Sequence, residues 1–325
     1  MASALAALRG LSIHPLARHP SPVDRLDRLR AALGPDAPDL WIKRDDLLSF
    51  GMGGNKVRKL QTVLADAKRL GATTLITCGG VQSNHCRATA AAGAALGWRV
   101  VLVVNGAEQA EPTGNARLDR LFGAEVVHVA SRDERDTAMQ AAAGRETAAG
   151  RVPFVIPLGV STPLGAAGFA RGVEELLGAM PAPDTILHAS SSGGTQAGLM
   201  AGCALFGLSC RVVGVSADES TERLVSIVRG LLTGVRDLIG ASDQAVGLTR
   251  DIDVDDGAIG EGYGIPTPAS TEALELVART EGILLDPVYT AKAMAALIAR
   301  IRGGHFSAQD RVLFWHTGGQ PGFFA

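Results

Sequence analysis

The chain is 325 residues long and carries 31 basic and 33 acidic side chains, a net charge of −2 with neutral histidines. This balance excludes the broad positive surface with which proteins attract nucleic acids or anionic membranes. The length exceeds the roughly 250–300 residues at which one core tends to split. We therefore expect two compact domains, a small-molecule substrate, and neither a nucleic-acid nor a membrane partner.

Short β-rich runs alternate with Ala-rich helical segments, which is the pattern of an α/β fold with mostly parallel sheets flanked by helices. The glycines that follow four of the helical segments are placed to end them in the left-handed conformation. Strands are predicted at 73–80, 99–105, 124–130, 154–159, 185–192, 211–217 and 312–317, helices at 55–71, 84–97, 168–180, 195–207 and 271–282, and helix-ending glycines at 71, 97, 207 and 282.

Two turn-rich zones, at 48–55 and 159–168, bracket four of these strand–helix units. We expect residues 53–164 to form a small inserted α/β domain. The remainder, 1–52 and 165–325, would form a large domain that binds the ligand. Binding sites favour the boundary between domains, so the cleft between the two is the expected site.

No segment has the features of a membrane span, a secretion signal, a disulfide framework or a metal site. The apolar runs are far shorter than the ~20 residues that cross a bilayer, and the N-terminus lacks a charged start followed by an unbroken apolar stretch. The four cysteines, Cys78, Cys86, Cys203 and Cys210, lack CxxC spacing. We expect a cytoplasmic protein with buried free thiols and no bound metal.

The stretch SSSGGTQAGL, residues 190–199, follows a predicted strand and opens a predicted helix. A glycine loop before a helix N-terminus aims free backbone N–H groups at an anion. The hydroxyls of Ser192 and Thr195 would add to the amides of Gly193 and Gly194. Neither GxxxxGK[ST] nor GxGxxG occurs here, which favours a single phosphate over a nucleotide. The alternative is a bare tight turn.

In GGNKVRKL, residues 53–60, Lys56 falls in the first turn of a predicted helix, where the helix dipole disfavours a cation. Burial and neighbouring cations would lower its pKa and make the amine a nucleophile for an aldehyde. The alternative is a solvated surface charge. Arg58 and Lys59 are interpreted as ordinary charges.

The stretch GGVQSNHCRATAA, residues 79–91, ends a strand and starts a helix. Ser83 is placed as the N-cap, with free amides behind it that suit a carboxylate. Asn84 follows it. His85 either joins this site or is a hydrogen-bonded core histidine, and the thiol of Cys86 is expected to face the core.

The only tyrosines of the chain are Tyr263 and Tyr289, both in Gly/Pro-rich stretches that we place at strand ends. Loops of this kind carry function more often than the elements that they connect. Near the C-terminus, VLFWHTGGQPG ends the last predicted strand with His316 and Thr317, a further stretch typical of a pocket edge.

Six stretches, IKRDDL, GGNKVRKL, GGVQSNHCRATAA, SSSGGTQAGL, EGILLDPVYTAKAM and HTGG, follow one another over about residues 41 to 319. In this order they resemble the fold-type II (tryptophan synthase β-like) pyridoxal-phosphate enzymes, in the branch of 1-aminocyclopropane-1-carboxylate (ACC) deaminase and D-cysteine desulfhydrase. The resemblance implies a two-domain α/β fold, pyridoxal 5'-phosphate as cofactor, a small amino-acid substrate and a homodimer.

The resemblance also implies roles for single residues. Lys56 would form the Schiff base with the cofactor's aldehyde, Asn84 would hydrogen-bond the ring hydroxyl, and Tyr289 would stack on the ring. The phosphate would be held by four residues of the glycine loop: Ser192, Gly193, Gly194 and Thr195.

On the substrate side, Ser83 and the amides of Asn84 and His85 would meet the carboxylate, and Tyr263 would be the second tyrosine of the pocket. Lys56 is the candidate base for the α-proton, with Ser83 or Tyr289 as alternatives.

Two threonines favour one branch of the family. ACC deaminases have glutamate directly after the stacking tyrosine and leucine in the HxGG stretch, where this chain has Thr290 and Thr317. A hydroxyl on the ring nitrogen, for which Thr317 is the candidate, makes a weaker electron sink than a carboxylate would. We therefore expect α,β-elimination, with D-cysteine giving pyruvate, ammonia and hydrogen sulfide, rather than opening of a cyclopropane ring.

Other functions stay open at this point. ACC deamination to 2-oxobutyrate is one, and L-cysteate sulfo-lysis is another. In the second, Arg58, Arg87 and Arg223 could donate hydrogen bonds to the substrate's sulfonate, but we interpret all three as surface or interdomain charges. A protein that only carries the cofactor or binds a partner is the non-enzymatic alternative, and a nucleotide-binding protein is disfavoured because the P-loop lysine is missing.

Overall fold

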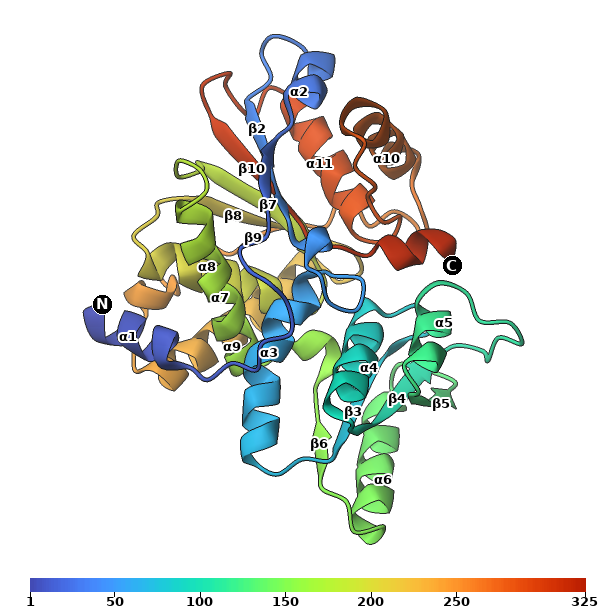
Figure 1. Cartoon of the computed structure of the whole chain (residues 1–325). Helices are drawn as coiled ribbons and strands as arrows, with labels where there is room; N and C mark the ends of the chain where they lie inside the picture. The colour runs from blue at the N-terminus through green and yellow to red at the C-terminus, as the bar shows by residue number, and fades with distance from the viewer.

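The computed structural model describes all 325 residues and contains two sheets (Figure 1). The larger has the order β1-β2-β10-β7-β8-β9, in which only β1 is antiparallel to its neighbour, and the smaller, β5-β4-β3-β6, is parallel throughout. The predicted α/β fold is therefore confirmed. The strands are β1 (Val23–Arg25), β2 (Asp39–Arg44), β3 (Thr74–Gly80), β4 (Arg99–Asn105), β5 (Glu125–Val129), β6 (Pro153–Val155), β7 (Thr185–Ser190), β8 (Arg211–Ser216), β9 (Asp253–Asp255) and β10 (Arg311–His316).

Helices cover both sheets, and none of them combines the length and the hydrophobicity of a membrane-spanning helix. The α-helices are α1 (Ala2–Gly10), α2 (Asp27–Leu33), α3 (Asn55–Arg69), α4 (Asn84–Leu96), α5 (Gly114–Leu121), α6 (Arg135–Ala148), α7 (Pro163–Leu177), α8 (Gly194–Leu205), α9 (Thr221–Ile239), α10 (Pro268–Glu281) and α11 (Thr290–Arg302). Four 3-10 turns are η1 (Asp45–Leu47), η2 (Leu158–Val160), η3 (Gln244–Val246) and η4 (Gln320–Phe324).

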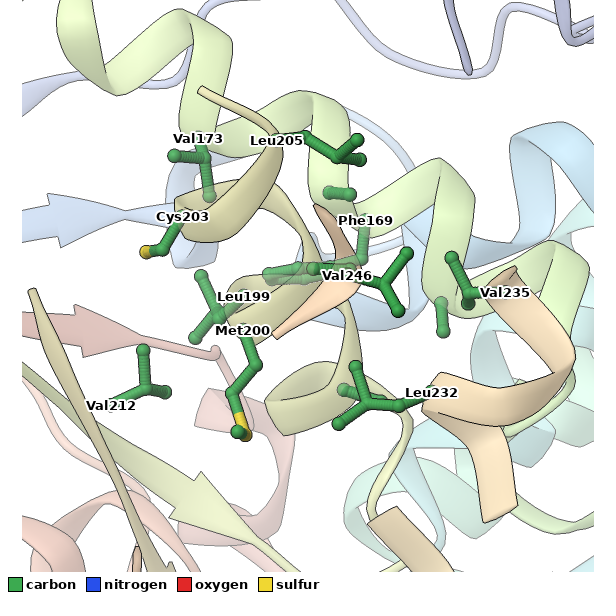
Figure 2. Close-up of a cluster of buried hydrophobic side chains, with 14 of the residues drawn as sticks. Phe169, Val173, Leu199, Met200, Cys203, Leu205, Val212, Leu232, Val235 and Val246 are labelled. Carbon is green, nitrogen blue, oxygen red and sulfur yellow. The ribbon is translucent and has the colours of Figure 1, made fainter. Parts of the chain in front are cut away.

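The larger sheet is buried on both faces, as its apolar strands require. One face packs against α7, α8 and α9, whose side chains point toward one another in Figure 2. The other face packs against α10 and α11. Successive residues of β8 show the alternation of a strand, because Val212 belongs to the first core and Val213 to the second.

The smaller sheet has its own cores. Leu60 and Leu64 of α3 pack with α4 against one face, and Met139 and Ala142 of α6 cover the other. Helix α3 also packs against α7 of the larger unit, where Thr62 Oγ1 donates to the carbonyl of Leu164. The helix thus lies between the two sheets, and the domain boundaries at 53 and 164 stay a prediction.

All seven predicted strands and all five predicted helices are present, with ends that differ by a few residues. The predicted glycines end their helices in the left-handed conformation, with φ of +74°, +69°, +73° and +67° at residues 71, 97, 207 and 282. Strands β1, β2 and β9 were not predicted. Two of them, Val23–Arg25 and Asp253–Asp255, are three residues long and mostly charged, so they contain no apolar run.

Candidate active site

A cavity of about 810 Å³ lies between the two sheets. It is lined by residues that come just after the carboxyl ends of β3, β7, β8 and β10, namely Ser83, Ser192, Asp218 and Thr317. This is the edge at which α/β sheets bind ligands. The cavity thus lies between the two sheets, where the site was expected.

Lys56 lines this cavity from the second position of α3. The glycines before it bring the chain close to neighbouring backbone: a Cβ on Gly53 (φ +67°) would stand 2.3 Å from the carbonyl oxygen of Asp46. Burial lowers the pKa of Lys56 to about 8, although the charge of Asp218 opposes the shift. A solvated surface lysine does not fit this placement, and the lowered pKa leaves more of the amine unprotonated near neutral pH than in an ordinary lysine.

The predicted anion loop connects β7 to α8, and Gly193 within it has φ +72°. Ser192, Gly193 and Thr195 line the cavity, whereas Gly194 does not. Instead the N–H of Gly194 donates to Ser161 Oγ (3.2 Å), and Ser161 Oγ donates to Ser192 Oγ (2.8 Å). The loop is therefore held from the side by Ser161, a residue that the sequence did not single out.

Asn55 holds the same loop from α3. Its Nδ2 donates to Thr195 Oγ1 (2.9 Å), and its backbone N–H donates to the carbonyl of Thr317 (3.0 Å). The residue before Lys56 thus ties the start of α3 to the anion loop and to the end of β10. This connection fixes the distance between the amine and the anion site.

Lys59 contradicts its interpretation as an ordinary charge. Its side chain is 1% exposed, lines the cavity, and donates to the carbonyl of Gly159 (3.1 Å). A Cβ on Gly194 would stand 2.9 Å from its Nζ. Burial and the charge of Lys56 lower its pKa well below the usual value. The signal in the sequence was the spacing, since residues three apart share a helix face.

Ser83 is the N-cap of α4 as predicted, because its Oγ accepts from the N–H of Cys86 (3.2 Å). Asn84 lines the cavity beside it. His85 is both a core residue and part of the wall: its Nε2 is 2.5 Å from Thr77 Oγ1. Burial holds the pKa of His85 well below its usual value, so the ring is neutral. Cys86 faces the core, as expected.

The two tyrosines meet in the cavity. Their hydroxyls are 2.5 Å apart and their rings meet edge to face at 5.8 Å and 69°. The prediction that they lie at strand ends is wrong, because Tyr263 lies in a turn and Tyr289 is the N-cap of α11. Burial raises the pKa of both. Both hydroxyls therefore carry their protons at neutral pH.

The two threonines that distinguish the branches differ in placement. Thr317 lines the cavity. Thr290 is fully buried and turns away from it, donating to Asp286 Oδ1 (2.7 Å) while accepting from the N–H of Asp286 (2.8 Å). Thr317 is thus the only threonine of the pair that lines the cavity.

Arg58 and Arg87 are not surface charges, because they are 3% and 1% exposed. Neither lines the cavity. Arg58 pairs with Asp45 (2.8 Å) and Glu175 (2.8 Å). Both arginines were interpreted from charge alone, which does not reveal a buried partner.

The mouth of the cavity carries a different pair of arginines. Arg223 lines it with a 70% exposed side chain paired to Glu219 (2.8 Å). The sequence did not single out Arg132, which follows β5 of the smaller sheet and contacts residues that follow strands of the larger one. Its Nη1 lies 3.5 Å from Asp218 Oδ2, and its guanidinium carbon lies 5.2 Å from the ring centre of Tyr263.

The donor set fits the phosphorylated aromatic aldehyde that the resemblance implies. An anion loop lies over a buried ammonium at Lys59, an amine with a lowered pKa lies at Lys56, and aromatic rings lie opposite. The protein supplies no carboxylate to either lysine within ion-pair distance. Two lysines that line the cavity without a carboxylate partner favour an anionic ligand there.

Comparisons with known proteins agree with this chemistry. The family profile described as "Pyridoxal-phosphate dependent enzyme" matches residues 15–318. The chain is 39% identical to the D-cysteine desulfhydrase of Salmonella newport over 318 residues, which is 94% of this chain and 93% of the relative. The solved structure titled "ACC deaminase homologue" superposes with a TM-score of 0.91 at 33% identity, covering 100% and 97% of the two chains. Threonine deaminase isoform 2 of Solanum lycopersicum shares the fold, with a TM-score of 0.68 at 15% identity over 97% of this chain and 83% of that one.

Proposed function

This chain belongs to the family of pyridoxal-phosphate dependent enzymes, and we propose that within it the protein is a lyase that performs α,β-elimination on a small amino acid, D-cysteine first. The products would be pyruvate, ammonia and hydrogen sulfide. The observation that carries this proposal is the 39% identity to D-cysteine desulfhydrase over 94% of the chain. The cavity supports the proposal because it is lined by the amine of Lys56, by the anion loop, and by the N-terminus of α4, which suits a carboxylate.

Several groups of the cavity would hold the cofactor. Lys59, Ser192, Gly193 and Thr195 would bind its phosphate, whereas Gly194, which was predicted to join them, would only support the loop. Asn84 would contact the ring hydroxyl, Tyr289 the ring face and Thr317 the ring nitrogen. Lys56 would carry its aldehyde carbon. When bound, pyridoxal phosphate supplies the electron sink that stabilises negative charge at the substrate's α-carbon.

The protein's own groups would then bind the substrate and move protons. The N-terminus of α4, with Ser83 and the amides of Asn84 and His85, would bind the carboxylate. The Lys56 amine would take the α-proton, because its lowered pKa leaves it free to accept one. Tyr289 is the weaker candidate for this base, since its raised pKa keeps its proton in place. The paired hydroxyls of Tyr263 and Tyr289 would instead donate to the departing sulfur.

ACC deamination is the second candidate, favoured by the TM-score of 0.91 to the structure titled "ACC deaminase homologue". Against it, the wall near β10 offers the hydroxyl of Thr317, and Thr290 is turned toward Asp286. L-cysteate sulfo-lysis would use the arginines at the mouth, but Arg132 and Arg223 already face Asp218 and Glu219.

Two measurements test the proposal. Purified protein should be yellow, borohydride should fix the cofactor to the peptide that contains Lys56, and Lys56→Ala should be colourless. Pyruvate and sulfide release should then be compared for D-cysteine, L-cysteine, L-cysteate and 3-chloro-D-alanine, with 2-oxobutyrate from ACC measured alongside. Dominant 2-oxobutyrate formation would replace the elimination proposal with the deaminase, and a wild type that binds no cofactor would sink both, leaving the non-enzymatic alternative.

We also propose a cytoplasmic homodimer with a small domain at 53–164. The four cysteines are buried and unpaired, which suits a reducing compartment. The homodimer rests on the family resemblance, and light scattering of the purified protein tests it. Limited proteolysis at the turns near residues 50 and 160 tests the domain boundaries.

A further inference from the structure

Asn115, at the second position of α5, is a buried polar residue that touches the segment carrying the predicted cofactor contact Asn84. It is fully buried. Its Nδ2 donates to the carbonyl of Gln82 (2.9 Å) and to Asn84 Oδ1 (3.0 Å). Its backbone N–H donates to Gln82 Oε1 (2.8 Å). Asn115 therefore connects α5 to the turn that precedes α4.

These contacts fix which end of each amide faces which way. The carbonyl of Gln82 can only accept, so the atom of Asn115 that touches it must be the nitrogen. The same nitrogen touches Asn84, so the Asn84 atom opposite must be an acceptor, its Oδ1. The donor end of Asn84, Nδ2, is left without a partner in the protein and belongs to a residue that lines the cavity.

The Asn115 side chain is not fully satisfied by the protein. Its Oδ1 is buried without a hydrogen-bond partner, which offsets part of what its two donated hydrogen bonds contribute to stability. What an asparagine adds is the orientation of Asn84.

We propose that Asn115 is a positioning residue that holds the Asn84 amide with its N–H₂ group toward the ring hydroxyl oxygen of the cofactor. The inference rests on the proposed function, in which Asn84 contacts that oxygen. A hydrogen-bond donor stabilises the deprotonated oxygen, whereas an acceptor would stabilise the protonated one. Asn115 thus sets the protonation state of the bound cofactor without touching it.

The test is the absorption spectrum of the substrate-free holoenzyme at one fixed pH. The visible band reports the deprotonated ring oxygen and the near-ultraviolet band the protonated one. In Asn115→Ala the ratio of visible to near-ultraviolet absorbance should fall about two- to tenfold, the factor that one hydrogen bond supplies. Asn115→Asp keeps the volume but can only accept once ionised, so Asn84 turns its Nδ2 away from the cavity and the ratio falls further.

Gln82→Ala is the matched control. It removes the Oε1 contact with the Asn115 N–H but keeps the backbone carbonyl and the Asn115–Asn84 hydrogen bond, so its spectrum should match that of the wild type. In the background of Asn84→Ala, the Asn115→Ala change should have no further effect. Circular dichroism identifies a variant that fails to fold, in which case Asn115→Asp decides.

Three outcomes overturn the inference: an Asn115→Ala spectrum equal to that of the wild type, additive effects in the double variant, or an equal shift in Gln82→Ala. A wild type that binds no cofactor would instead refute the proposed function. If the wild type binds cofactor normally and Asn84→Ala has the same spectrum, only the role of Asn84 is refuted, and with it this inference.

Discussion

Helix α3 carries three cations within one turn, Lys56, Arg58 and Lys59, and they differ in what surrounds them. Arg58 donates to both oxygens of Asp45 and to both oxygens of Glu175, at 2.8–2.9 Å. Lys56 and Lys59 line the cavity and have no carboxylate within ion-pair distance. Protein carboxylates therefore balance the charge of Arg58, whereas no carboxylate balances Lys56 or Lys59.

The difference separates structure from function. A buried charge is tolerated when it is paired and hydrogen-bonded, and otherwise its pKa shifts toward the neutral form. The carboxylates keep Arg58 charged and raise its pKa despite burial, whereas burial lowers the pKa of both lysines. Groups that lie in a cleft with a strongly shifted pKa, as these lysines do, are characteristic of functional sites.

The largest expected effect is the loss of stability when Arg58 is replaced. Arg58→Met leaves Asp45 buried and unpaired, and breaking a buried pair in this way costs about 3–5 kcal/mol. Asp45 is fully buried, and its pKa, which burial alone would raise, is held low by Arg58. The free energy of unfolding from denaturant titration should fall accordingly.

Arg69→Met on the same helix is the control, because Arg69 pairs with Asp66 at the surface with a 69% exposed side chain. Its expected cost is about 0–1 kcal/mol. An Arg58→Met protein of normal stability that had lost cofactor binding would place Arg58 in the site and break the comparison.

The next effect is on the rate at which the apo-protein takes up cofactor. Only an unprotonated amine attacks an aldehyde, so the rate should rise with pH and level off above a midpoint near 8, the lowered pKa of Lys56. An ordinary lysine would still be rising near pH 10, since its pKa is about 10.4. Stopped-flow absorbance measures the profile, and a midpoint near 10 would show that Lys56 is solvated.

Lys59→Met tests the second unpaired cation. A charge-assisted hydrogen bond contributes about 1.5–3 kcal/mol, so affinity for the cofactor should fall about 10- to 100-fold. The apo-protein should not lose stability, because Lys59 has no carboxylate partner and burial already disfavours its charged form. Equilibrium dialysis and thermal melting of the apo-form measure the two quantities.

Lys68→Met, an exposed lysine of the same helix, should change neither quantity. If Lys59→Met instead destabilised the apo-protein and left the affinity intact, Lys59 would belong with Arg58 as a structural cation.

These contrasts also show how far the sequence could lead. Strand–glycine–helix junctions are local, so the anion loop at 190–195, the Ser83 cap and the position of Lys56 were predictable from neighbours in the chain. The partners of Arg58 lie 13 and 117 residues away. No local pattern reports that distance, so a paired arginine and an unpaired lysine look alike in GGNKVRKL.

The same limit applies to the supporting contacts of the site. Ser161, Asn55 and Asn115 act on residues that lie 31 to 140 positions away in the chain. Asn55 lies within GGNKVRKL, but nothing in that stretch reports its contact with Thr195, and Ser161 and Asn115 belong to no motif. These contacts form only when the chain folds, so they could not be predicted from neighbours in the sequence.

The smallest expected effect concerns a neutral group among these cations. The Thr317 side chain lines the cavity and its hydroxyl makes no hydrogen bond within the protein, while its backbone carbonyl, which accepts from Asn55, is kept in any variant. If the hydroxyl contacts the ring nitrogen, Thr317→Leu removes one neutral hydrogen bond, about 1 kcal/mol, and kcat for elimination should fall about fivefold. Thr317→Ser should restore it, because serine supplies the same hydroxyl. Because an uncharged partner contributes only one hydrogen bond, an elimination rate that is unchanged in Thr317→Leu would show that Thr317 is not the group that tunes the ring nitrogen.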